Sequence, residues 1–252
     1  MTNNAMTAAM DWWQWAILIV AGLLIGMSKT GFQGINTPTI PLLALAFGAK
    51  ESTGIILPML CMADLIAVIY YRRSAQWKYI GKLLPYAIAG FFVAIWVERY
   101  IPAAQFRYLM AGCIFAGLVF MFWQERQGEK AMITRKWWYS PTFGLTGGFT
   151  TMIGNAAGPV MAIYLLSMNL PKYAFVGTSA WFFLIVNYLK LPLQIVVWDN
   201  ITWESVLVDV MVLPAIITGA VMGIKLVKKL PEKSYRKMIL WLTVVATAML
   251  LI

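Results

Sequence analysis

Long apolar runs alternate with short polar segments along nearly the whole chain. Each run is close to the length of about 20 residues that an α-helix needs to cross a bilayer. The runs occupy residues 12–27, 52–71, 80–97, 106–123, 171–191, 205–227 and 235–252. This pattern predicts an all-α polytopic membrane protein.

Two stretches place polar residues where membrane depth is expected. Residues 22–38 read GLLIGMSKTGFQGINTP, and residues 144–159 read GLTGGFTTMIGNAAGP. An apolar helix that reaches Met27 cannot continue through Ser28 and Lys29 without exposing polar groups to lipid, so we expect it to break there. A shorter apolar segment follows each break. Each half of the chain is therefore predicted to open with a broken helical hairpin, and in transporters such breaks form the substrate site.

Landmarks of the first half recur in the second half, in the same order and at nearly constant separation. The equivalent pairs are Gly22 and Gly144, Pro38 and Pro159, Gly54 and Gly177, and Asp64 and Asn187. One shared glycine pair could arise by chance, but four ordered pairs indicate an internal duplication.

The basic residues indicate how the two halves are oriented. They concentrate in loops near residues 72–82, 124–138 and 225–237. Because Lys and Arg accumulate in cytoplasmic loops, these loops are predicted to lie inside, and the loops near Arg99 and Asp199 outside. Equivalent loops then lie on opposite sides of the membrane. We therefore predict two inverted-topology repeats, residues 1–124 and 139–252, joined by a cytoplasmic loop at 125–138. Each repeat would be a broken helical hairpin followed by three transmembrane helices.

The composition excludes several classes of function. The chain is 61% hydrophobic and 12% charged, and its net charge of +10 lies mostly in the loops. A lipid bilayer, and not nucleic acid, is therefore the expected partner. The chain contains no His, two Cys and no Gly-rich phosphate-binding motif. We expect no metal or other cofactor and no enzymatic activity.

The glycine and proline pattern of the two stretches resembles the TauE/SafE family of membrane permeases, the sulfite exporter family. The positions that carry the resemblance are Gly22, Gly26, Gly31, Gly34, Pro38, Gly54, Gly144, Gly148, Gly154, Gly158, Pro159 and Gly177. The resemblance implies movement of sulfite, organosulfonates or small carboxylates across a bacterial inner membrane. The chain departs from the family's run of consecutive glycines by placing other residues among them. These are Phe32, Gln33, Ile35 and Asn36.

Lys29 is the sharpest candidate for substrate binding, because a buried ammonium group needs an anionic partner. That partner would be an anionic substrate or Asp64; alternatively, the long side chain reaches the membrane interface. Neighbouring hydroxyl and amide groups would donate hydrogen bonds to the same anion, although such groups also hold membrane helices together. The candidate substrate-binding residues are Lys29, Thr30, Gln33, Asn36, Thr151 and Asn155. Thr150 is a further candidate.

Asp64 and its equivalent, Asn187, form a pair of which one member is charged. An intramembrane carboxylate can bind and release a proton, which would couple transport to the proton gradient, or it can balance the charge of Lys29. Lys190 is predicted near the outer end of its span, where it would capture an anion or extend to the interface without a function.

These features favour a secondary transporter that exports a small anion across the bacterial cytoplasmic membrane by alternating access. A passive anion channel and an uptake permease for a small carboxylate or sulfonate are the alternatives. The sequence leaves open the anion, the direction, the coupling ion and whether the hairpins are re-entrant or cross the membrane twice. It also leaves open the oligomeric state, with a homo-oligomer among the alternatives.

Overall fold

A computed structural model describes residues 10–36, 38–101, 137–235, 237–239 and 241. The main elements of these residues are all α-helices. They are α2 (Trp12–Thr30), α3 (Thr39–Phe47), α4 (Ala49–Tyr71), α5 (Trp77–Glu98), α7 (Tyr139–Gly154), α8 (Gly158–Ser167), α9 (Lys172–Val196) and α10 (Trp203–Lys229). Five of these helices, α2, α4, α5, α9 and α10, are long and apolar enough to cross a membrane. The protein is therefore an all-α polytopic membrane protein, as predicted.

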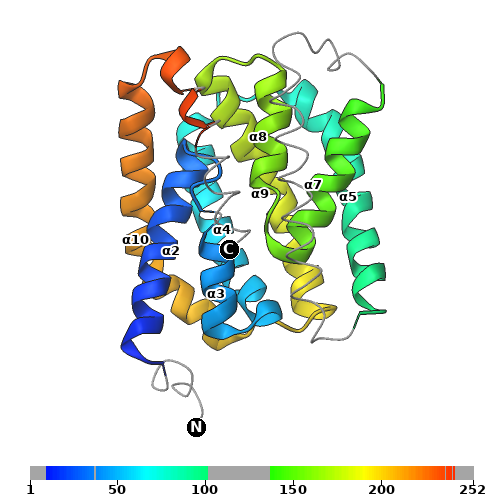
Figure 1. The fold of residues 1–252 in the computed structure, drawn as a ribbon, viewed down its shortest axis with the longest axis vertical. Helices are drawn as coiled ribbons and strands as arrows, with labels where there is room; N and C mark the ends of the chain where they lie inside the picture. Colours follow the sequence, from blue (N-terminus) through cyan, green and yellow to red (C-terminus); the bar gives the residue numbers. More distant parts are fainter. Residues whose placement is uncertain (1–9, 37, 102–136, 236, 240, 242–252) are drawn as a thin grey trace.

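The two short helices complete the two broken hairpins. Figure 1 shows α3 returning toward the end of the bundle where α2 begins, and α8 returning toward the opposite end. The Tyr71 hydroxyl donates a hydrogen bond to Thr30 O, and Asn155 Nδ2 donates one to Thr53 O. The two breaks therefore pack against opposite ends of α4. The inverted repeat itself stays a prediction, and the predicted helices at 106–123 and 235–252 lie wholly or largely outside the described residues.

The predicted end of the first helix was wrong. We expected a break after Met27, but α2 continues through Ser28 and Lys29 to Thr30. The helix can continue because its polar side chains find partners in the protein and are not exposed to lipid. The Thr30 hydroxyl, for example, donates to Ala220 O of α10. The chain then leaves helical geometry from Gly31 until α3 begins.

The centre of the bundle is formed by α4 and α9. In the most apolar 18-residue stretch of each helix, 78% of the α4 residues and 67% of the α9 residues are buried. The corresponding share is 39% in each of α2, α5 and α10. Of the outer helices, α2 and α10 pack closely against each other, and α5 packs closely against α7. Glycines permit this approach: a Cβ at Gly148 would overlap the carbonyl oxygen of Ala87, and one at Gly26 would overlap that of Ile216.

Candidate substrate site between the two helix breaks

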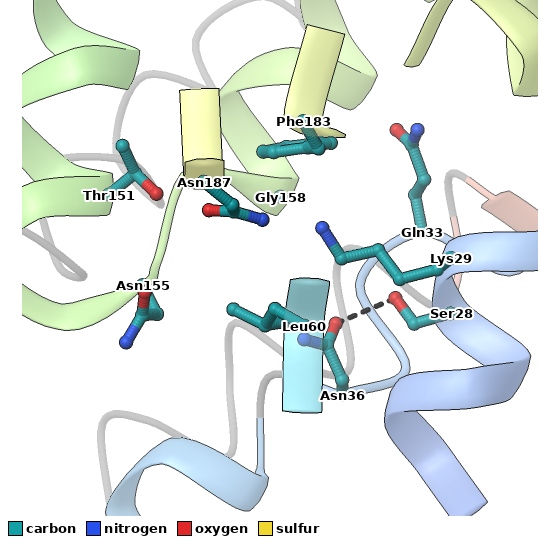
Figure 2. Close-up of a pocket in the computed structure, with 10 residues that line it drawn as sticks. All are labelled: Ser28, Lys29, Gln33, Asn36, Leu60, Thr151, Asn155, Gly158, Phe183 and Asn187. Carbon is teal, nitrogen blue, oxygen red and sulfur yellow. Dashed lines mark hydrogen bonds between the residues drawn. The ribbon is translucent and has the colours of Figure 1, made fainter. Parts of the chain in front are cut away.

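A single pocket brings the two helix breaks together at the centre of the bundle (Figure 2). Its empty space, counted together with the open solvent at its mouth, is about 360 Å³. Figure 2 shows side chains of the first break on one side of the pocket and those of the second break on the other. The lining residues are Ser28, Lys29, Gln33, Asn36, Leu60, Thr151, Asn155, Gly158, Phe183 and Asn187.

Lys29 lies in this pocket and is already paired with a carboxylate. Its Nζ lies 2.8 Å from Asp64 Oδ1 and 3.1 Å from Asp64 Oδ2. Nζ also lies 4.0 Å from the centre of the Phe183 ring, a cation–π contact. The Lys29 side chain is 9% exposed, so it does not extend to the membrane interface. Of the alternatives that the sequence left open for Lys29, the structure shows the ion pair with Asp64.

Asp64 is held by a second polar contact from α9. Its side chain is fully buried, and Asn187 Nδ2 donates a hydrogen bond of 2.6 Å to Asp64 Oδ2. Lys29, Asp64 and Asn187 thus join α2, α4 and α9 at one wall of the pocket. These contacts fit the charge-balancing role that the sequence allowed for Asp64.

The first break contributes amide groups with unused hydrogen-bonding capacity. The Ser28 hydroxyl donates a 2.7 Å bond to Asn36 Oδ1, and no partner for Asn36 Nδ2 is found among the described residues. Gln33 Nε2 donates to the Ser179 hydroxyl, whereas Gln33 Oε1 has no described partner. The Asn36 amide is therefore available to donate a hydrogen bond to a solute.

The second break is held by Lys190, whose position differs from the prediction. Lys190 is fully buried, so its side chain does not extend to the interface, and α9 continues past it to Val196, so it does not mark the end of a span. Its Nζ donates to Thr151 O at 2.8 Å, Thr151 Oγ1 at 3.1 Å and Asn155 Oδ1 at 2.6 Å. Asn155 adopts a left-handed conformation, with φ of 54°, and ends α7.

A family model described as "Sulfite exporter TauE/SafE" matches residues 16–250, nearly the whole chain. The chain belongs to the TauE/SafE family. No curated protein and no solved structure matches the chain. The protein is therefore a membrane transporter of a family that moves sulfite or related anions.

Some polar residues predicted for the TauE/SafE substrate site point elsewhere. Thr30 donates to Gly26 O and Ala220 O, so its hydroxyl faces α10 and not the pocket. Thr150 donates to carbonyl groups of its own helix. The other candidates, Lys29, Gln33, Asn36, Thr151 and Asn155, all line the pocket, as does Asn187.

Sequence reasoning did not select three of the lining residues, Ser28, Leu60 and Gly158, and it favoured a packing role over a pathway role for Phe183. Helical spacing was the available signal for Phe183, because it lies one turn before Asn187 on α9. Gly158 begins α8, whose positive helix end therefore lies at the pocket. The site combines amide donors and a helix N-terminus, which together suit a small oxyanion. Among the described residues, no cluster of His, Cys, Asp or Glu could hold a metal ion.

Proposed function

We propose that this TauE/SafE protein is a secondary transporter that exports sulfite or a small organosulfonate across the bacterial inner membrane. The observation that carries the proposal is the polar pocket formed by both helix breaks. The pocket lies among buried helices, where few groups other than those of the protein can compensate the charge of a solute. Amide and hydroxyl donors would therefore replace the water that surrounds the anion in solution.

Alternating access would expose this pocket to one side of the membrane at a time. The two breaks belong to hairpins that enter the bundle from opposite ends, as Figure 1 shows. Rocking of one hairpin against the other would open a path on one side while the opposite break closes the other. In this proposal, inward movement of protons drives the export of the anion.

Flux through proteoliposomes tests the site. Asn36→Leu and Asn155→Leu each remove a polar group from one break, so uptake of radiolabelled sulfite into vesicles preloaded with sulfite should fall about tenfold or more. The matched control is Thr218→Val. Thr218 lies on α10, outside the pocket lining, and its hydroxyl donates to Pro214 O of the same helix, so this variant should transport at the wild-type rate. Wild-type flux in both leucine variants would contradict the proposal.

The same vesicles separate a coupled transporter from a passive channel. A transporter should show saturable flux that is accelerated by an imposed pH gradient. Flux that neither saturates nor responds to the pH gradient would identify a channel and refute alternating access.

A further inference from the structure

Three buried charged side chains lie at the pocket or directly behind its lining, and they differ in how their charges are compensated. Lys29 and Asp64 form an ion pair at 2.8 Å, which leaves no net charge on the two residues. Lys190 has no carboxylate within ion-pair distance in the part of the chain that the structure describes. All three of its acceptors are neutral oxygens of Thr151 and Asn155.

The ammonium group of Lys190 lies directly behind residues that line the pocket. Both residues that Lys190 contacts, Thr151 and Asn155, line the pocket. They are 2% and 7% exposed, and Lys190 itself is fully buried. Little solvent therefore separates the ammonium group from a solute in the pocket, and its field there is only weakly screened.

A buried ammonium group that contacts only neutral acceptors remains costly, because its desolvation is incompletely offset. An anion in the pocket would provide the missing opposite charge. We propose that Lys190 supplies the positive charge that the transported anion neutralises, while Lys29 is held in a neutral pair with Asp64. This inference rests on the proposed anion transport, and it assigns Lys190 a role through Thr151 and Asn155 without direct contact with the solute.

The size of the effect follows from the position of Lys190. An anion that binds Asn155 or Thr151 would lie about 5 Å from Lys190 Nζ, two hydrogen-bond lengths away. At an effective dielectric constant of about 20, removal of that charge weakens binding by about 100-fold. Lys190→Met should therefore raise the sulfite dissociation constant by about this factor. A purely structural role would lower stability without this dependence on charge.

Charge rescue distinguishes these two roles. In Lys190→Met with Asp64→Asn, Lys29 loses its carboxylate partner and becomes the uncompensated cation of the pocket. Sulfite affinity should then recover by tenfold or more relative to Lys190→Met, about the factor expected for one charged contact. Failure to recover in a folded double variant would overturn the proposal, because removal of the Asp64 charge cannot replace a lost structural lysine.

A second comparison leaves Lys190 unchanged, so it stands even if the Lys190 variants do not fold. Lys29→Met with Asp64→Asn removes both members of the pair and should bind sulfite within about tenfold of the wild type. Lys29→Met alone leaves Asp64 to cancel the charge of Lys190 and should bind more weakly than this double variant. Equal losses in the two variants would show that Lys29 is the required cation.

The measurement is sulfite binding to purified protein in detergent by isothermal titration calorimetry, with thermal unfolding as the check on folding. Ethanesulfonate and acetate serve as additional probes. Binding of none of these anions by the wild type would defeat the proposed function. Wild-type binding that is unchanged in folded Lys190→Met would defeat only the assignment of Lys190.

Discussion

The close packing of α7 on α5 makes a quantitative prediction for two adjacent glycines. Gly148 faces α5 so closely that a Cβ would overlap the carbonyl oxygen of Ala87 and lie 2.7 Å from Ala87 Cα. At Gly147, one residue earlier, the nearest heavy atom to a Cβ is Val160 Cγ1 at 3.8 Å, an ordinary contact. Gly148→Ala and Gly147→Ala therefore add the same methyl group to the same helix in different surroundings.

The difference in stability between the two variants isolates the steric effect. Both gain the same helix propensity, about 1 kcal/mol for Gly to Ala, so this gain cancels in the comparison. To restore normal carbon–carbon contacts at Gly148, α7 must move away from α5 by about 1 Å. Such overpacking costs about 1–3 kcal/mol. Gly148→Ala should therefore be about 2 kcal/mol less stable than Gly147→Ala.

Thermal unfolding in detergent, followed by circular dichroism at helical wavelengths, checks this difference. For a chain of this length, about 2 kcal/mol corresponds to a difference in Tm of about 4–8 °C. Sulfite flux should also fall in Gly148→Ala, because α7 carries Thr151 into the pocket one turn further on. Equal Tm values for the two variants would refute the close approach of α5 and α7.

Three further substitutions test the described contacts by thermal unfolding. Tyr71→Phe removes the hydrogen bond to Thr30 O and should lower the free energy of unfolding by about 1 kcal/mol; no change would disagree with the placement of the first break. Asp209→Asn should leave the free energy of unfolding unchanged or raise it, because neither oxygen of this buried carboxylate has a hydrogen-bond partner among the described residues. A large loss of stability would contradict this and reveal a partner. Glu98→Gln should cost less than about 1 kcal/mol, because its ion pair with Lys50 at 2.9 Å is partly exposed.

The sequence predicts the helices well because each span must be continuously apolar to cross lipid. Helix ends at polar residues are harder to predict, since the outcome depends on partners elsewhere in the chain. Lys29 remains helical because Asp64 of another helix neutralises it. The predicted span ends at residue 191, which puts Lys190 near its outer end, whereas α9 continues to Val196 and the Lys190 side chain is fully buried.

For the pocket, residue type alone does not give the direction of a side chain. Lys29 and Thr30 are adjacent and both polar, but consecutive helical residues point about 100° apart, so one faces the pocket and the other faces α10. Leu60 and Phe183 line the pocket although their sequence pattern is that of any core residue. The polar lining was therefore largely predictable, whereas the apolar lining required the packing of α4 and α9.

The predicted repeat gives the contact between Asp64 and Asn187 a further meaning. In the predicted repeat these residues are equivalent, and equivalent residues of a two-fold arrangement can meet only near its axis. In the structure, Asn187 Nδ2 lies 2.6 Å from Asp64 Oδ2. Two carboxylates at that distance would repel each other, whereas the Asn187 amide donates to Asp64. The equivalent of Asp64 is therefore neutral, so the single carboxylate can balance Lys29 but not Lys190 as well. Divergence of the two halves at this one position would thus leave an uncompensated positive charge on the Lys190 side of the pocket, which is the charge that we propose the anion neutralises.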